Sequence, residues 1–183
     1  DYAVTNETVG IPSEAVKTLA ENDAVESVST TRLSVFMPGA GDILPFETDL
    51  SVQSHETLQL VNVDEAQLQI YAPNLSAQDK QALKDGTGCL VKNPIAFSYG
   101  DTTVQQTDLT VGDTIQLGDR TLPVLGLIDT AITINNDGFT NGVQLIVNDE
   151  IYCSLLGNDS YSEVYPTLQD NADTDTFESW LDS

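Results

Sequence analysis

The stretch from Val111 to Asp129 reads V-G-D-T-I-Q-L-G-D-R-T-L-P-V-L-G-L-I-D, and it decides the fold. Gly-Asp pairs at positions 112–113 and 118–119 predict two tight turns. Each pair precedes a short run of β-branched and aliphatic residues, which predicts strands over Thr114–Leu117 and Leu122–Ile128. This two-stranded unit is the most specific pattern in the chain, and we place the other elements around it.

The region around this unit, residues 102–147, is typical of β structure throughout. Strands are expected at Thr102–Gln106 and Gly142–Val147, with a strong turn signal at Asn135-Asn136-Asp137-Gly138 between them. The segment Ile95–Tyr99 fits a helix or an extended strand equally well, and Ile43–Glu56 has few periodic signals. Earlier in the chain, alternation and β-branched content predict strands over Val25–Phe36, Leu58–Val63, Gln67–Tyr71 and Cys89–Val91.

Capping residues and helical spacing predict four helices. Ser13 is a good N-cap for the first, Ser76 for the second, and Asn148 or Asp149 for the third, which Gly157 ends. The helices are expected over Ser13–Asn22, Ala77–Lys84, Asp149–Leu156 and Asp170–Leu181, with a strand over Tyr161–Leu168 before the last one.

Helix–strand pairs of similar size therefore stand at both ends of the chain, and they could lie in one sheet. Together with the β-rich middle, they predict an α+β fold. We expect a discontinuous α+β lobe built from both chain ends, residues 1–93 and 148–183, with an inserted β-rich lobe over residues 94–147.

The charge of the chain excludes several classes of partner. It has 29 acidic and six basic residues among 183, for a formal net charge of -23. Such a surface repels phosphate backbones and anionic lipid headgroups, which excludes nucleic-acid binding. It is compatible with cationic ligands or divalent ions, and equally with a charge that only keeps the chain soluble. The longest apolar runs are far shorter than the roughly 20 residues that a membrane span needs.

The best candidate for a metal site is the loop around Asp129, Asn135, Asn136 and Asp137, which offers the hard oxygen ligands that calcium needs. In an EF-hand register, however, Thr133 occupies the first ligand position, and Gln144 stands where the bidentate glutamate belongs. We therefore interpret the loop as a hairpin turn and assign no metal ligand.

Candidates for catalysis are equally weak. His55 beside Glu56 could act as a general base, but no nucleophile motif accompanies it. Among so many acids, the adjacent pairs Asp64-Glu65 and Asp149-Glu150 are expected by chance, and the glycines at 86 and 88 lack the spacing and the lysine of a phosphate-binding loop. We assign no catalytic and no cofactor-binding residue, and we do not expect an enzyme.

The two cysteines, Cys89 and Cys153, lie in apolar settings, G-C-L-V and I-Y-C-S-L-L. We favour two separate thiols that pack as small hydrophobic side chains. One disulfide is the alternative, and it would need Cα atoms within about 7 Å of each other.

The order of elements resembles a known family. Four features carry the likeness. Two precede the hairpin: a capped helix, an acidic break and V-x-x-V over Ile11–Val28, and a helix, a glycine and a strand over Leu83–Asn93. The other two are the G-D-x-I-x-L and V-x-G-I pair within Leu109–Ile128, and a strand, a helix and a second strand over Gln144–Leu168. Together they resemble the extracytoplasmic domain of FtsX-like (MacB-type) ABC transporter permeases. Residues Gly39–Glu56 match nothing in that pattern.

The resemblance implies a membrane protein. A transmembrane helix would precede Asp1 and another would follow Ser183, with this domain outside the cell membrane. A cytoplasmic ABC ATPase subunit would be its partner, and ATP-driven movement would pass to the outer domain and from there to a substrate or an extracytoplasmic protein. The domain would need no cofactor. The alternative is a free-standing secreted binding or adhesion module, possibly calcium-dependent.

Overall fold

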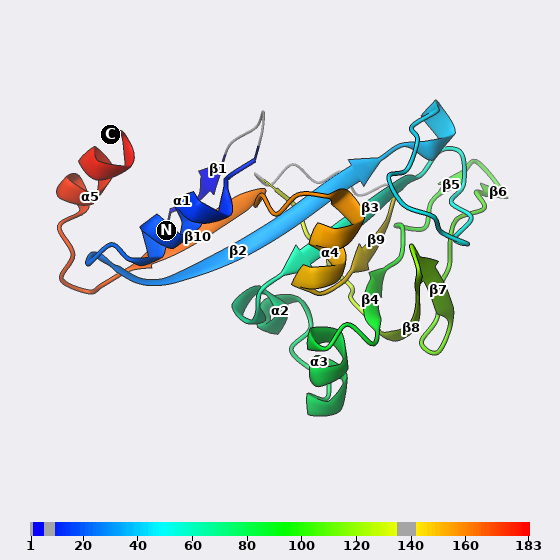
Figure 1. The fold of residues 1–183 in the computed structure, drawn as a ribbon. Helices are drawn as coiled ribbons and strands as arrows, with labels where there is room; N and C mark the ends of the chain where they lie inside the picture. Colours follow the sequence, from blue (N-terminus) through cyan, green and yellow to red (C-terminus); the bar gives the residue numbers. More distant parts are fainter. Residues whose placement is uncertain (1, 6–9, 135–141) are drawn as a thin grey trace. The chain divides into compact units, whose positions relative to one another are not determined.

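A computed structural model describes residues 2–5, 10–134 and 142–183, and it has the mixed α+β architecture expected from the sequence (Figure 1). The chain divides into two compact units. Unit 1 consists of Asp1–Thr31 and Asp159–Ser183, and unit 2 of Arg32–Asn158. Unit 1 is therefore discontinuous and contains segments from both chain ends. Unit 2 is longer than the lobe expected at residues 94–147 and includes it.

Strands from both chain ends form the sheet of unit 1. Its order is β1 (Val4–Thr5), β10 (Glu163–Leu168) and β2 (Val25–Phe36), and both neighbouring pairs are antiparallel. In this register Val164 lies opposite Val4 on one side and opposite Thr30 on the other. A strand from the C-terminal segment thus lies between two from the N-terminal segment.

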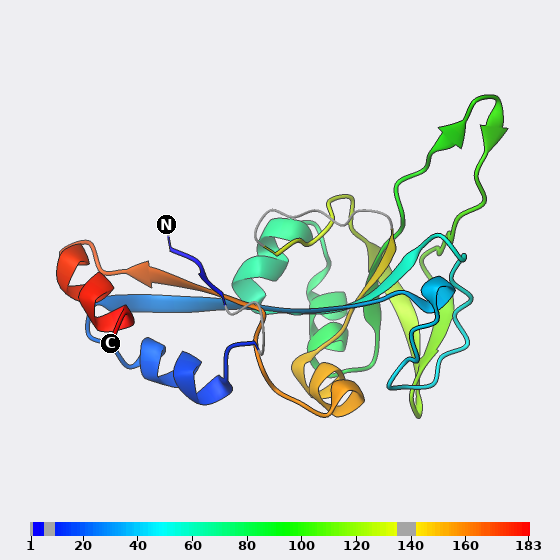
Figure 2. The ribbon, with the colours of Figure 1, turned by 90° about the horizontal axis from the view of Figure 1, so that it is seen from above.

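Two helices accompany these strands, α1 (Ser13–Ala20) and α5 (Thr174–Leu181) (Figure 2). The predicted N-cap at Ser13 is wrong: Pro12 is the N-cap, because its backbone is extended and Ser13 is already helical. The last helix begins at Thr174 rather than at Asp170, because Asp173 accepts hydrogen bonds from the first turn's N–H groups.

The core of unit 1 also draws on both chain ends. The ring of Phe177, which is 1% exposed, contacts Tyr2 edge-on with centroids 5.6 Å apart, and it stacks on Trp180 at 5.9 Å. The other buried side chains of this core are Ile11, Leu19, Val25 and Val164. Burial of these side chains against one another stabilises the pairing of the two ends.

Unit 2 contains a mixed sheet. From the second half of β2 its order is β3 (Thr57–Val63), β9 (Gly142–Ile146), β4 (Cys89–Lys92), β8 (Arg120–Leu127) and β7 (Thr114–Leu117). The pairs β3–β9 and β4–β8 are parallel, whereas β4–β9 and β7–β8 are antiparallel. The predicted hairpin is thus confirmed as β7–β8, at the end of the sheet order.

Helices cover both faces of this sheet. α4 (Asp149–Leu156) packs on one face, and α2 (Glu65–Tyr71) and α3 (Ala77–Lys84) pack on the other (Figure 2). Along β3 and β9 successive side chains enter alternate cores, so that nearly every residue of both strands is buried. Such double burial favours aliphatic residues, and the buried amides of Gln59 and Gln144 are hydrogen-bonded to each other at 2.7 Å.

The strand predicted over Gln67–Tyr71 is wrong, because these residues form α2. The side chain of Asp64 accepts a hydrogen bond from the N–H of Gln67 at 3.0 Å, and so caps the helix. Leu68 and Tyr71, three residues apart, pack against the core, whereas Ile70 is 68% exposed. The alternation of Leu68 and Ile70 suggested a strand, but only one of the two is turned to the protein interior.

Other boundaries shift less. Ser76 caps α3 as predicted, by accepting from Asp79 N at 3.1 Å. Of the two candidates for the cap of α4, Asn148 is the N-cap and accepts from Ile151 N at 2.9 Å. The strand predicted at Thr102–Gln106 is shortened to β6 (Thr102–Thr103), which pairs with β5 (Ser98–Tyr99). A short 3-10 helix, η1 (Pro38–Ala40), follows β2. None of the helices in the described ranges has the length and apolar character of a membrane span.

Replacing Phe177 by alanine is expected to lower the free energy of unfolding of unit 1 by roughly 3–5 kcal/mol, because a buried ring is lost and a cavity remains. Trp180 is the only tryptophan of the chain, so its fluorescence during a guanidinium titration reports on unit 1. Leu181→Ala, on the same helix and 37% exposed, is the control and should shift the midpoint far less. Equal shifts in the two variants would contradict the buried position of Phe177.

Candidate functional site

The residues considered for metal binding do not form a described site. Asn135, Asn136 and Asp137 lie outside the described residues. Gln144 is buried in β9, where its side-chain amide donates to Gln59 Oε1 and to Ile132 O, each at 2.7 Å. In the ranges that the structure describes, no three His, Cys, Asp or Glu side chains are grouped so that they could hold an ion.

The residues considered for catalysis have structural partners. Glu56 is 2% exposed, and it accepts hydrogen bonds from Thr107 N at 2.9 Å and from Thr107 Oγ1 at 2.6 Å. The ring of His55 contacts the ring of Phe97 edge-on, with centroids 5.8 Å apart. Asp64 caps α2, as described above. These positions hold neighbouring segments together.

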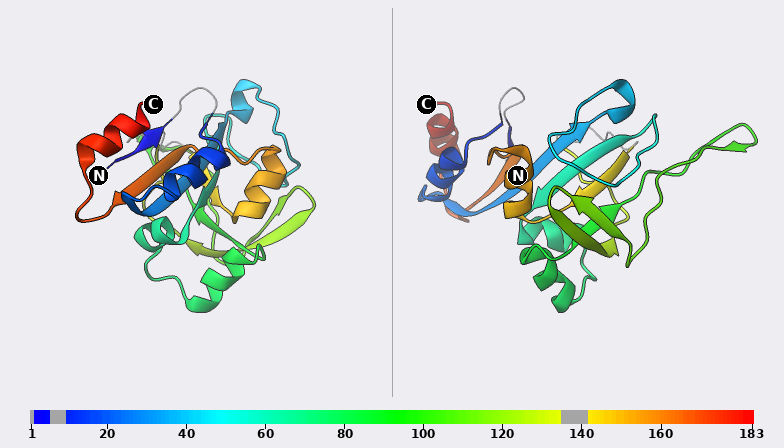
Figure 3. Two further views of the ribbon diagram at one scale, coloured as in Figure 1. Left: turned by 60° about the vertical axis from the view of Figure 1, so that its left-hand side comes forward. Right: turned by 45° about the vertical axis from the view of Figure 1, so that its right-hand side comes forward.

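The most unusual surface of unit 2 is a projecting hairpin between β4 and β7, which we call the arm (residues 94–108) (Figures 2 and 3). Ile95, Phe97 and Tyr99 are 54%, 43% and 86% exposed. They stand at alternate positions of an extended segment, which places them on one face. A row of exposed apolar side chains on a projecting element is typical of an interaction surface.

Hydrogen bonds close the base of the arm. The side chain of Asn93 accepts from Leu109 N at 2.9 Å and donates to Leu109 O at 2.8 Å. Further out, the side chain of Gln106 donates to Ile95 O at 2.5 Å and accepts from Phe97 N at 3.3 Å. These bonds fix the two strands of the arm to each other before any partner binds.

Sequence reasoning left this segment undecided between helix and strand. The signal that could have identified the arm is the alternation of Ile95, Phe97 and Tyr99 followed by Gly100-Asp101, a turn-forming pair. Gly100 has a φ of 59°, in the left-handed region that favours glycine.

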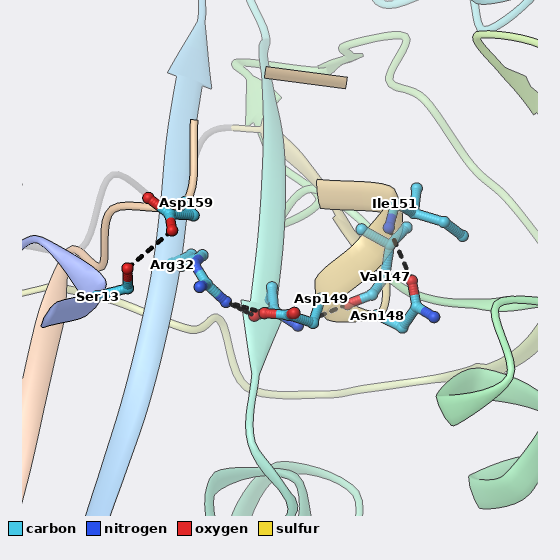
Figure 4. A network of polar contacts seen from close by, with 8 residues as sticks. Ser13, Arg32, Val147, Asn148, Asp149, Ile151 and Asp159 are labelled. Atoms are coloured by element: carbon cyan, nitrogen blue, oxygen red, sulfur yellow. Dashed lines mark hydrogen bonds and ion pairs between the residues drawn. The ribbon is translucent and has the colours of Figure 1, made fainter. Parts of the chain in front are cut away.

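A second group of polar contacts joins β2, β3 and α4 inside unit 2 (Figure 4). Arg32 is 3% exposed, and its guanidinium forms an ion pair with Asp149 and donates to Asn62 Oδ1 at 2.9 Å. The Asn62 amide in turn donates to Val147 O at 3.1 Å. This group holds the start of α4 against two strands of the sheet. In unit 1, a separate bond from Ser13 Oγ to Asp159 Oδ2 measures 2.8 Å (Figure 4).

Both cysteines are present as thiols and not as a disulfide. Cys89 is fully buried in β4, and Cys153 is half-buried in α4. Burial raises the pKa of the Cys89 thiol to about 12. The interpretation of Cys89 as a packed apolar side chain agrees with this position.

Comparisons with known proteins give similarity in structure only. No family model and no curated protein matches the sequence. Among solved structures, the extracellular domain of the noncanonic ABC-type transporter YknZ from Gram-positive bacteria matches with a TM-score of 0.53 and 11% identity, over 97% of this chain and 85% of that one. The chain therefore shares the fold of the extracellular domain of this ABC-type transporter. This is the fold that the sequence resemblance implied.

Two further structures have lower scores. The periplasmic region of MacB from Actinobacillus actinomycetemcomitans has a TM-score of 0.49 and 11% identity, over 97% of this chain and 72% of that one. A domain of a putative permease protein from Porphyromonas gingivalis has a TM-score of 0.47 and 16% identity, over 91% and 72%. At such identities the likeness extends to the fold alone.

Replacing Asp149 by alanine is expected to lower the free energy of unfolding of unit 2 by roughly 2 kcal/mol, a value between those of exposed and buried ion pairs. The side chain of Arg32 is 4% exposed and that of Asp149 is 71% exposed, so the loss falls on a largely buried guanidinium. Urea unfolding followed by circular dichroism measures the change.

Glu150→Ala is the matched control, because Glu150 occupies the same first turn of α4 and pairs with Arg120, whose side chain is 37% exposed. Both substitutions remove a carboxylate from the same helix N-terminus, so the dipole contribution cancels. Glu150→Ala should lower the free energy of unfolding by less than about 1 kcal/mol. A cost for Glu150→Ala as large as that for Asp149→Ala would contradict the buried placement of Arg32.

In a Cys153→Ser variant, Cys89 is expected to resist iodoacetamide while the protein is folded. The thiolate is the reactive form, and with a pKa of about 12 only about one thiol in 10⁴ is ionised near pH 8. Mass spectrometry should find the native variant unmodified and the guanidinium-unfolded variant fully modified. Modification of the native variant at the rate of a free thiol would show that Cys89 is accessible.

Proposed function

We propose that this chain is the extracytoplasmic domain of an FtsX-like (MacB-type) ABC transporter permease. It binds a substrate or a partner protein outside the membrane, and it transmits conformational change that an ATPase drives from the cytoplasmic side. In this role the chain itself catalyses no reaction.

The observation that carries the proposal is the pairing of both chain ends in one sheet, within a fold shared with the outer domain of YknZ. β10 is hydrogen-bonded to β1 on one side and to β2 on the other, so a displacement of either chain end acts on the same three strands. This arrangement suits a domain inserted between two membrane helices, because both of its ends must approach the membrane.

The organisation of unit 2 supports the same role. Its strands β3 and β9 are buried on both faces, and interiors packed in this way transmit strain instead of absorbing it. The polar residues that could have served catalysis, Glu56 and Asp64, are engaged in holding segments and caps in place. The apolar face of the arm is exposed to solvent, and such a face is suited to binding a partner.

The test is a distance measurement in the full-length permease assembled with its ATPase. Spin labels at Glu14→Cys in unit 1 and Gln78→Cys in unit 2, both exposed positions, are introduced in a Cys153→Ser background. The buried Cys89 is not expected to take up label. We expect the distance distribution between the labels to change when the ATPase binds ATP.

The control pair is Gln78→Cys with Ser154→Cys, both in unit 2, whose distance should stay constant. A membrane-impermeant maleimide should label Tyr99→Cys in intact cells, which locates the domain outside. Labelling only after lysis, or a distance between the units that ATP leaves unchanged, would refute the proposal. Release of the whole protein into the medium would favour the free-standing secreted module.

A further inference from the structure

The arm has one apolar and one polar face. Ser98 pairs with Thr103 and Tyr99 with Thr102, and Val104 N donates to Phe97 O at 3.3 Å. Since paired residues of an antiparallel hairpin lie on the same face, Val104 shares a face with Phe97. With Ile95 and Tyr99 they form an apolar row along the arm.

The arm is organised before binding. Its base is closed by the bonds of Asn93 to Leu109 and of Glu56 to Thr107, and its outer part by the side chain of Gln106. A partner therefore meets a surface whose backbone is already ordered, so that less entropy is lost on binding. Both strands of the arm belong to a two-stranded sheet of their own, so each has one edge without a neighbouring strand in the described structure.

The charges around the arm have one sign. The sequence has no lysine or arginine from Leu33 to Asp79 and none from Asn93 to Asp119. Lys92, at the base, is 9% exposed, and its ammonium donates to Asn93 O at 2.5 Å. The arm itself has two exposed carboxylates, Asp101 and Asp108. Three more, Asp42, Glu47 and Asp49, lie on the loop that leads to Ser51 and Glu56, the residues that contact Thr107 at the base of the arm.

We propose that the apolar face of the arm docks a basic polypeptide segment, one that presents apolar side chains to Ile95, Phe97 and Tyr99 and carries lysine or arginine beside them. An extended segment of this kind can pair with a free edge of the arm while its apolar side chains cover the row. Its cations meet the carboxylates of Asp101 and Asp108 on the arm and the faces of the two aromatic rings. The proposal deepens the proposed function by naming the class of partner, and it rests on that function only for the location of the arm outside the membrane.

The same charges argue against the other occupants of such a face. A second copy of the chain would bring another net charge of -23 against the first. Anionic lipid and nucleic acid are repelled for the same reason. A basic partner alone combines attraction at long range with an apolar contact at short range.

The probe is a short synthetic peptide in which lysine and leucine alternate, so that an extended strand has one basic and one apolar face. Binding of the dye-labelled peptide to the chain is followed by fluorescence anisotropy. Two control peptides replace every lysine by glutamate or every leucine by serine. We expect the lysine–leucine peptide to bind at least tenfold more tightly than either control, and to bind more weakly as salt is added.

The variant for the test is Phe97→Ser with Tyr99→Ser, which should weaken binding at least tenfold. The matched control is Ile70→Ser with Val111→Ser, because these side chains are 68% and 62% exposed and lie outside the arm. All four side chains are substantially exposed, so both variants should keep the circular dichroism spectrum of the parent chain.

Several results would overturn the proposal: no binding of the lysine–leucine peptide, equal loss in both variants, or equal binding of the glutamate peptide. Dimerisation in sedimentation that only the arm variant abolishes would assign the face to a second copy. Co-sedimentation with phosphatidylglycerol vesicles that depends on the arm would assign it to lipid. The assay uses the chain in solution, so peptide binding can fail while the ATP-dependent distance change succeeds, and the reverse.

Discussion

Antiparallel pairing between β10 and β2 is the interaction on which the rest of the structure depends. It begins with Glu163 opposite Thr31 and continues along β10 to Leu168. The paired segments are separated in sequence by the whole of unit 2. Closing so long a loop costs entropy, although that cost grows only slowly with length. The ladder is therefore reinforced by a core to which both ends contribute, in which Phe177 packs against Tyr2.

Signals that act over a few residues could be predicted from the sequence. The β7–β8 hairpin needs only its two Gly-Asp turns and alternating strands, and the caps at Ser76 and Asn148 need only the next helical turn. The strand predicted over Gln67–Tyr71 failed where two local signals compete. Alternation favoured a strand, but Asp64 supplies a cap and the core receives side chains at helical spacing. The cap was visible in the sequence, and it was the stronger signal.

The polar groups of unit 2 could not be predicted in the same way. Arg32 gives no local signal, because it stands in a strand among polar residues and its partners Asn62 and Asp149 come from distant parts of the chain. The same holds for Glu56: its carboxylate accepts from the nearby Gln53 N at 3.2 Å, but its other partner, Thr107, comes from a distant part of the chain. Buried charges and their partners are set by tertiary structure. The arm escaped prediction for the opposite reason: its side chains are exposed, so packing leaves no periodic pattern beyond one apolar row.

The positions of the basic residues explain why the acidic surface has consequences for binding. Arg32 and Lys92 are buried, and Arg120 pairs with Glu150, so half of the few cations are engaged within the fold. At physiological ionic strength the screening length is about 8 Å, and only charges near a binding face act on a partner that touches it. On the arm itself those charges are the carboxylates of Asp101 and Asp108. For the basic segment proposed above, we expect charge to govern the rate of association, and contact with Phe97 and Tyr99 to govern the rate of dissociation. An acidic surface attracts any cation weakly and at many places. An apolar row at one place on that surface adds a short-range contact, so a partner with both basic and apolar side chains is bound there in preference to other cations.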